Sequence, residues 1–226
     1  SWSTAWGEDG YCYVSYEDQA IESGVAHVIE ADPLKYPVLN QHNYLLKNNY
    51  YEFDSPQAKG MAASYNSKKS QFVKAVGFHV NEDDSSYEIK ILKNSKNPNE
   101  GETVFEQSGE FGADGLAKWS GHRTVELDSY VLLSEGEDYT VITKVIDKDG
   151  NVQSSVSVSG TQDNPGFGIF NIEEGCSFIH LPDENIWKDL SEYNSQAVMR
   201  TLNKETNSSQ GKDFTVSSLS SNDSNS

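Results

Sequence analysis

The chain has 226 residues, of which 35% are hydrophobic and 11% aromatic, so it can bury a sizeable core and is not disordered throughout. Its net charge of −18 would repel a phosphate backbone, which argues against nucleic acid as a partner. It contains no apolar run of about 18 residues, so the sequence predicts no membrane-spanning helix.

The first 31 residues predict a turn and two short strands. The run Glu8-Asp9-Gly10 is a turn signal. The aromatic-rich segment 11–16 follows it and predicts a strand, and the alternating segment 25–29 predicts a second one. Strands this short need a larger sheet to pair with. Proline-containing connections at Asp32-Pro33 and Tyr36-Pro37 place a domain boundary near residues 32–45.

The segment from about residue 44 to residue 203 has the pattern of an all-β domain. Short alternating runs are separated by turn sequences at short intervals, which is typical of a sandwich or barrel. No window of eleven or more residues shows a helical period. The predicted strands are residues 50–53, 71–79, 87–92, 123–133, 138–146, 154–158, 177–179 and 196–202.

Side-chain alternation predicts which residues of these strands face the core. We expect Val73, Ala75, Val76 and Phe78 to point inward, and Trp187 to pack as a large apolar plug. In segment 87–92 the charged and apolar side chains alternate, so they should lie on opposite faces of the sheet. Residues 204–226 are rich in Ser and Asn and predict a flexible linker or tail.

The opening residues place Ser-Trp, Trp-Gly and Gly-Tyr pairs at positions 1–2, 6–7 and 10–11. This spacing resembles a motif of the papain-like cysteine peptidases. The family pattern is Asn-Ser-Trp-Gly-x-x-Trp-Gly-x-x-Gly-Tyr, and this chain reads Ser-Trp-Ser-Thr-Ala-Trp-Gly-Glu-Asp-Gly-Tyr, with Ser3 in place of the usual Gly. The resemblance implies that residues 1–35 are the carboxyl-terminal remnant of a peptidase domain. It also implies that Trp2 shields the hydrogen bond between the catalytic His and its orienting Asn. Aromatic and glycine strings also occur in carbohydrate-binding β-domains, which is the alternative interpretation.

The resemblance places the catalytic Asn just before Ser1, and the His and the nucleophilic Cys further upstream. These 226 residues are therefore expected to lack catalytic activity, although the parent protein is expected to be a cysteine endopeptidase that acts on protein or peptide substrates. Cys12 has no evident neighbouring base or helix amino terminus to activate it.

Short motifs lie at residues 50–54, 72–78, 87–91, 121–127, 175–179 and 187–190. In their order along the chain, they resemble the lectin-like domain that follows the peptidase domain in cell-surface cysteine peptidases of the clostridial cell-wall type. The resemblance covers residues 44–203 and implies a jelly-roll-like antiparallel β-sandwich, an extracellular or cell-surface location, and contact with cell-wall glycan. Two other interpretations of this segment stay open, namely an independent carbohydrate-binding module and a structural spacer.

Candidate glycan-binding residues are an aromatic in a polar loop and an aromatic on a predicted strand. Trp119 is flanked by Lys118, Ser120 and His122, and Tyr50 is the second candidate. Each of them can equally pack against its own domain.

Cofactor and metal predictions are limited to calcium. The runs Glu82-Asp83-Asp84 and Asp147-Lys148-Asp149-Gly150 bring oxygens together but fit ordinary turns equally well, and we assign no ligands to them. Asp54 and Asp189 are a further pair that could meet near one end of the sandwich.

Neither zinc nor nucleotide is indicated by the sequence. The histidines show no zinc-binding spacing, and no phosphate-binding glycine loop is present. The two cysteines, Cys12 and Cys176, can either form a disulfide or lie as separate buried thiols. The histidines are His27, His42, His79, His122 and His180.

Overall fold

The computed structural model describes residues 8, 11, 36–43, 49–55, 57–113, 118–159 and 169–206. Contacts divide the chain into two compact units, Ser1–Pro33 and Leu34–Ser226. Trp2, Cys12, the predicted strand 25–29, the predicted strand 11–16 except for Tyr11, and nearly all of the predicted tail lie outside the described residues. Within the first unit, the backbone N–H of Glu8 donates to the carbonyl oxygen of Tyr11 at 2.8 Å, and Tyr11 donates back to Glu8 at 3.1 Å. This antiparallel bridge closes the chain where the sequence predicts a turn.

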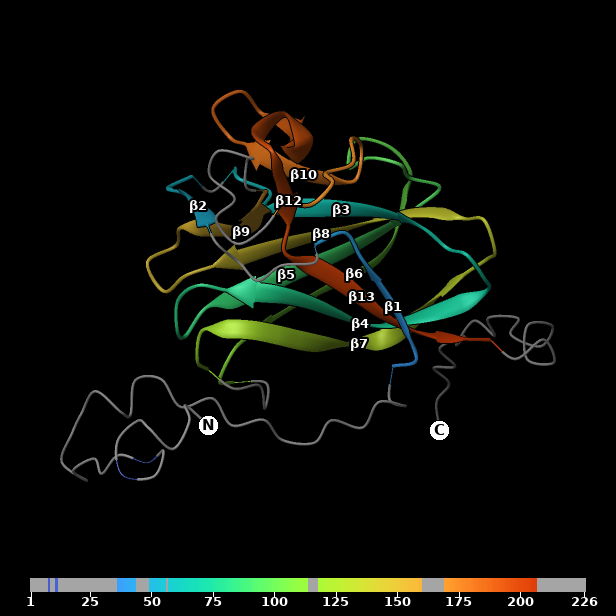
Figure 1. Ribbon diagram of the computed structural model, residues 1–226, viewed down its shortest axis with the longest axis horizontal. Helices are drawn as coiled ribbons and strands as arrows, with labels where there is room; N and C mark the ends of the chain where they lie inside the picture. Colours follow the sequence, from blue (N-terminus) through green and yellow to red (C-terminus); the bar gives the residue numbers. More distant parts are fainter. Residues whose placement is uncertain are drawn as a thin grey trace, which may run out of the picture. The chain divides into compact units, whose positions relative to one another are not determined.

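The second unit consists of two antiparallel sheets (Figure 1). One sheet has four strands, in the spatial order β1 (Val38–Gln41), β13 (Met199–Glu205), β4 (Gln71–Val80) and β7 (Gly121–Leu133). The other has nine strands, and its main path runs β11 (Ile186–Asp189), β10 (Ser177–Leu181), β3 (Met61–Asn66), β8 (Asp138–Ile146), β5 (Ser86–Lys93) and β6 (Glu102–Glu110). Off this path, β9 (Val152–Val158) pairs with β8, β2 (Asn49–Phe53) and β12 (Ser195–Ala197).

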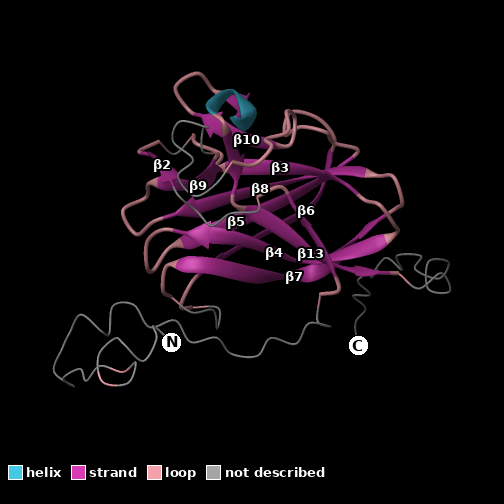
Figure 2. Ribbon diagram, viewed as in Figure 1, coloured by secondary structure: helices cyan, strands magenta, loops and turns pink. Residues whose placement is uncertain are grey.

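The all-β, jelly-roll-like sandwich expected from the sequence is confirmed. Figure 2 shows strands throughout the described part, with a single helical turn beside β10, the 3-10 helix η1 (Leu190–Tyr193). The eight strands predicted between residues 50 and 202 all fall on observed strands. The segment 196–202 is interrupted at Val198, whose N–H donates to the carbonyl of Ser155 at 3.0 Å as the chain passes from the nine-stranded to the four-stranded sheet.

The core lies between the two sheets. Val73, Val76 and Phe78 belong to it as expected, while Ala75 is buried but lies outside the core cluster. A register shift in the β4–β7 pairing between Val73 and Ala75 accounts for this break in the alternation.

One buried hydroxyl connects the two sheets through polar contacts. Tyr139 of β8 is fully buried, and its Oη lies 2.9 Å from Oγ1 of Thr201 on β13. The same Oη accepts a hydrogen bond from Nδ2 of Asn40 on β1 at 2.8 Å. The tyrosine therefore joins the nine-stranded sheet to two strands of the other sheet.

Four strands were not predicted, namely β1, β3, β6 and β11. Strand β3 lies centrally between β10 and β8. It carries the small residues Ala62, Ala63 and Ser64, and all three are buried. A strand covered on both faces shows no polar alternation, which explains why its pattern was not recognised.

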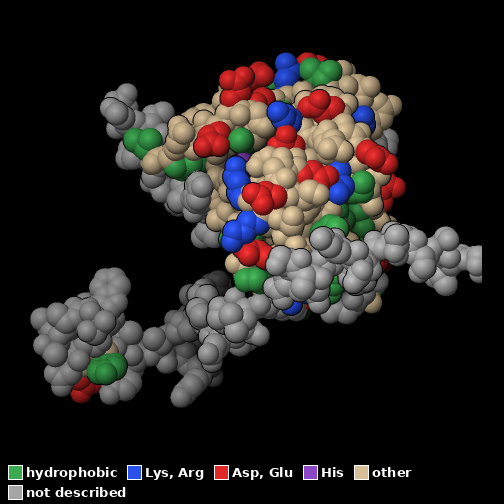
Figure 3. Space-filling model, turned by 90° about the vertical axis from the view of Figure 1, so that its right-hand side faces the viewer, with side chains coloured by type: hydrophobic (Ala, Val, Ile, Leu, Met, Phe, Trp, Pro, Cys, Tyr) green, Lys and Arg blue, Asp and Glu red, His purple; other side chains and the backbone are tan. Residues whose placement is uncertain are grey.

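The described surface carries both signs of charge. Figure 3 shows acidic and basic side chains interspersed on the face it presents. Among the residues that the structure describes, no helix has the length and apolar character needed to span a membrane.

Candidate functional site

A groove of about 960 Å³ lies over strands β5, β6 and β8 of the nine-stranded sheet. We call it the β5 groove. Its other borders are the segment 57–59, the loop at Pro98 and Asn99, and the end of the molecule that carries Asn185 and Trp187. The strand residues that line it are Glu88, Ile89, Lys90 and Leu92 from β5, Thr103, Glu106, Gln107 and Ser108 from β6, and Ile142 and Lys144 from β8.

Side-chain alternation in β5 places its charged residues in this groove. Ile89 and Ile91 are buried in the core, whereas Glu88 is exposed and Lys90 half-buried on the opposite face, as the sequence predicts. The pairing register sets Glu88 opposite Lys144 and Lys90 opposite Glu106. The groove floor is therefore polar because of the alternation of β5 and the register of its neighbours.

Two ion pairs order the floor of the β5 groove. Nζ of Lys90 lies 2.6 Å from Oε1 of Glu106, and Nζ of Lys144 lies 3.7 Å from Oε1 of Glu88. Such half-exposed pairs add little to stability. Each ammonium has three N–H donors and each carboxylate accepts several hydrogen bonds, so the pairs keep spare donors and acceptors for a ligand.

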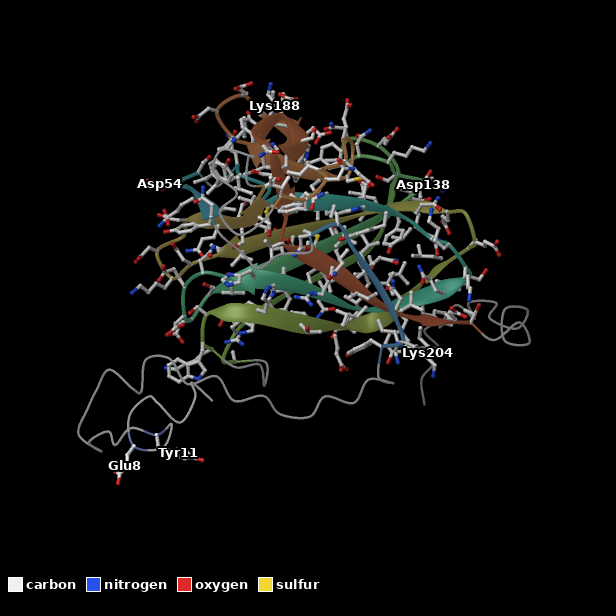
Figure 4. All side chains as sticks on the ribbon, viewed as in Figure 1. Glu8, Tyr11, Asp54, Asp138, Lys188 and Lys204 are labelled. Atoms are coloured by element: carbon white, nitrogen blue, oxygen red, sulfur yellow. The ribbon has the colours of Figure 1, made fainter. Side chains whose placement is uncertain are left out.

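A half-buried tryptophan lines the groove from β11. Trp187 packs edge-to-face against His180 of β10, with ring centroids 5.2 Å apart and an interplanar angle of 71°. It is followed on β11 by Lys188, which Figure 4 labels. Trp187 is therefore a groove residue and not only the apolar plug that the sequence pattern indicates.

His180 connects this tryptophan to the segment 57–59. The His180 ring is buried, and its Nδ1 accepts a hydrogen bond from the backbone N–H of Lys59 at 3.3 Å. Burial, with a smaller effect from the Lys59 charge, lowers the pKa of His180 below its ordinary value, which favours the neutral ring that can accept this bond. One buried imidazole thus positions two borders of the groove.

Gly60 allows the segment 57–59 to lie close to β8. Its φ is +84°, and a Cβ at this position would overlap the carbonyl oxygen of Thr143 and lie 2.9 Å from Cα of Lys144. The Gly60 carbonyl also accepts a hydrogen bond from the N–H of His180 at 3.0 Å. The close backbone approach therefore requires glycine here.

The two glycan-binding residues predicted from the sequence lie on other elements. Trp119 is 59% exposed in the loop before β7, where Nζ of Lys118 sits 4.7 Å from its ring centroid. Arg123 donates to the carbonyl oxygens of Trp119 and Ser120 and so holds this loop. Tyr50 is 40% exposed on β2. Neither residue lines the β5 groove, and both stay predictions.

One carboxylate in each acidic run considered for calcium accepts hydrogen bonds from the backbone. Burial raises the pKa of Asp147, but hydrogen bonds from Asn151 and Asp149 outweigh it, so the pKa lies below the usual value. Asp83 accepts from the backbone N–H of Ser120 at 2.6 Å. Calcium stays a prediction without assigned ligands.

Asp189, the other carboxylate considered for calcium, caps a helix. It accepts at the amino end of η1 from the backbone N–H of Ser191, at 2.9 Å. Asp54, its suggested partner, follows β2, which pairs with β9 and not with the strands beside Asp189.

The described cysteine is not poised for nucleophilic chemistry. Cys176 carries a free, half-buried thiol. Burial, followed by the negative charge of Glu173, raises the pKa of this thiol to about 11. The thiol is therefore protonated at neutral pH, when it is a poor nucleophile.

Comparison with known proteins identifies the domain. Residues 41–218 match the family described as "Lectin like domain". The chain is similar to a solved structure of the clostridial cysteine protease Cwp84, a variant after propeptide cleavage, with 16% identity and a TM-score of 0.52 over 75% of this chain and 40% of that one.

A second solved structure, of the cysteine protease and lectin-like domains of Cwp84, a surface-layer-associated protein of Clostridium difficile, matches with 17% identity and a TM-score of 0.48. This match covers 65% of this chain and 32% of that one. The chain thus spans less than half the length of either solved chain. No curated protein sequence matches it. Since the family match covers most of its length, the chain belongs to the lectin-like domain family.

Proposed function

We propose that the lectin-like domain binds a saccharide in the β5 groove. The observation that carries this proposal is the presence of one half-buried tryptophan beside a polar floor in a single concavity of about 960 Å³. Ligand pockets of proteins typically measure about 300–1,000 Å³ and combine apolar surface with a few polar groups that fix orientation.

The chemistry of the groove suits the surface of a sugar ring. Sugar hydroxyls both donate and accept hydrogen bonds, and the floor offers ammonium donors at Lys90 and Lys144 and carboxylate acceptors at Glu88 and Glu106. The apolar C–H face of a pyranose packs on an aromatic ring, for which Trp187 is available.

The charge of the groove differs from that of the whole chain. Its lining contains three lysines, including Lys59, and two glutamates, Glu88 and Glu106, which leaves one net positive charge in a chain whose net charge is −18. The groove can therefore receive anionic as well as neutral saccharides, because its local field does not repel a carboxylate.

A glycan array tests the proposal when it is probed with the wild-type chain and four variants. Trp187→Ala should lose binding, and Trp187→Phe should recover part of it because an aromatic face is restored. Trp119→Ala and Tyr50→Ala, the aromatics predicted from the sequence, should bind as the wild type does. Binding that survives Trp187→Ala but is lost in Trp119→Ala would refute the groove and favour the loop before β7.

We further propose that this domain is the accessory part of a secreted or cell-surface papain-like cysteine peptidase. Support comes from the opening Ser-Trp…Trp-Gly…Gly-Tyr pattern and from the protease and lectin-like domains that occur together in Cwp84. A saccharide-binding module would hold such a peptidase at a glycan-coated surface. If no saccharide binds, a spacer between peptidase and cell wall is the remaining role.

The sequence upstream of Ser1 in the parent gene tests this second proposal. We expect an Asn directly before Ser1, then a His and a Cys further back. The 226 residues alone should show no thiol-dependent peptidase activity. Activity of this chain that a cysteine alkylator blocks, or an upstream sequence without these residues, would contradict the proposal.

A further inference from the structure

Three side chains with metal-binding atoms meet at one place outside the β5 groove. His42 follows the end of β1, and Glu173 and Cys176 lie in the segment that leads into β10. One ligand atom from each of these residues lies within 4.8 Å of the other two. In the described part of the chain, no other group of His, Cys, Asp or Glu meets this criterion.

The three residues line a second pocket, of about 460 Å³. Asp138, which Figure 4 labels, lines it as well. The two lysines of this pocket contact lining residues other than the trio. Lys96 lies 3.7 Å from Oδ2 of Asp138, and Nζ of Lys68 donates to Oδ1 of Asn66 at 3.3 Å. The trio is thus open to a small ion and is not neutralised by these lysines.

The histidine is held in a tautomer that suits a metal ligand. Nε2 of His42 lies 2.6 Å from the carbonyl oxygen of Ser64, and since a carbonyl only accepts, Nε2 carries the proton. The ring also stacks on Tyr65, with centroids 4.8 Å apart and planes 4° from parallel. In the neutral ring Nδ1 keeps its lone pair, and a backbone carbonyl on the other nitrogen is the usual outer partner of a metal-bound histidine.

We propose that His42, Glu173 and Cys176 bind one zinc ion, or a similar borderline divalent metal. One nitrogen, one sulfur and one carboxylate form a ligand set that zinc takes and that calcium and magnesium do not. A tetrahedral zinc with Zn–S near 2.3 Å and Zn–O near 2.0 Å sets these two ligands about 3.5 Å apart. Sγ of Cys176 lies 3.6 Å from Oε2 of Glu173, which is close to this expected distance between the two ligand atoms.

A cation would also favour the thiolate form of Cys176, which is the form that binds a metal. The thiol of Cys176 lies next to two carboxylates, Glu173 and Asp189, and both help to raise its pKa. A divalent ion reverses this effect, because it stabilises the thiolate and the carboxylate together. Three protein ligands leave the fourth tetrahedral position to water or to another group.

The ion would connect the two sheets at one end of the sandwich. His42 adjoins β1 in the four-stranded sheet, whereas Cys176 directly precedes β10 in the nine-stranded sheet. Metal binding across such a junction stabilises the folded state, because the unfolded chain does not preform the site. Spacing rules miss the site because its ligands come from segments far apart in the sequence.

The test is a titration of the metal-stripped full chain with Zn²⁺ by calorimetry, and with Co²⁺ by absorption. We expect one high-affinity equivalent per chain, a thiolate-to-cobalt charge-transfer band, visible bands of tetrahedral intensity, and a higher Tm with zinc. His42→Gln and Cys176→Ser should each weaken zinc binding by more than about 100-fold. Removing a residue that only hydrogen-bonds to a ligand weakens metal binding by about 10–100-fold, so a larger loss indicates direct coordination. Both should also lose the rise in Tm.

Cys12→Ser and His27→Gln are the matched controls, since they remove the same residue types elsewhere in the chain. They should keep the affinity and the cobalt spectrum of the wild type. The proposal is overturned if no equivalent binds, if the cobalt spectrum is octahedral without a thiolate band, or if the controls lose binding while His42→Gln and Cys176→Ser retain it. Circular dichroism of the stripped variants shows that a loss of binding is not a loss of fold.

Discussion

The replacement Gly60→Ala should destabilise the domain by more than a glycine replacement at a turn normally does. Gly60 has φ +84°, a backbone region that costs a residue with a Cβ about 1–2 kcal/mol. The new methyl group would also overlap the carbonyl oxygen of Thr143 and lie 2.9 Å from Cα of Lys144. Both are backbone atoms of a central strand, so moving them adds roughly 1–3 kcal/mol. We therefore expect a loss of about 2–5 kcal/mol in the free energy of unfolding.

Gly136→Ala is the matched control for this experiment. Gly136 has nearly the same φ, +80°, but a Cβ there would meet nothing within 4 Å. Only the backbone cost of about 1–2 kcal/mol should remain. Urea unfolding of the two variants, followed by tryptophan fluorescence, measures the difference. Equal losses would refute the argument that the segment 57–59 can lie close to β8 only because Gly60 has no side chain.

Three further predictions concern buried groups. Tyr139→Phe removes the hydroxyl that contacts Thr201 and Asn40 across the sheets, and it should lower the free energy of unfolding by about 1–3 kcal/mol. Urea unfolding measures this loss, and an unchanged midpoint would contradict the role of the hydroxyl. Burial raises the pKa of Tyr65 and Tyr139 above 10.0. The contribution of these two tyrosines to the free energy of unfolding should therefore be constant below pH 10 and fall as the pH rises beyond it, because the unfolded chain loses these protons first. A free energy of unfolding that does not fall above pH 10 would contradict the raised pKa of these tyrosines. In metal-free protein, Cys176 should react with iodoacetamide about 100-fold more slowly at pH 7 than a free cysteine, because its pKa near 11 leaves little thiolate. Peptide mass spectrometry measures the rate of labelling. Labelling as fast as that of a free cysteine would contradict the raised pKa.

Most of the sandwich could be predicted from sequence because its long strands alternate clearly. Strands β4, β5, β7 and β8 carry apolar residues toward one core and end at explicit turns, such as the one that begins at Asp147. The missed strands lack that signal for different reasons. Both faces of β3 are buried, β6 is largely exposed, and β1 is a four-residue strand in a proline-containing connection.

The β5 groove could be predicted only in part. The outward direction of Glu88 and Lys90 follows from period-two alternation within one strand. Their partners Lys144 and Glu106 depend on the register between strands, which alternation does not set. Trp187 has no sequence signal that separates a core residue from a groove residue, because its place depends on the pairing of β11 with β10 and on His180.

The most direct test of saccharide binding in the β5 groove is a nuclear magnetic resonance titration of the isotope-labelled chain. The ligand is the saccharide that binds best on the array. The account predicts that amide shifts concentrate in β5, β6, β8 and the residues around Trp187, together with its indole N–H. Shifts confined to the loop at Trp119 or to β2 around Tyr50, with the groove amides unmoved, would contradict it.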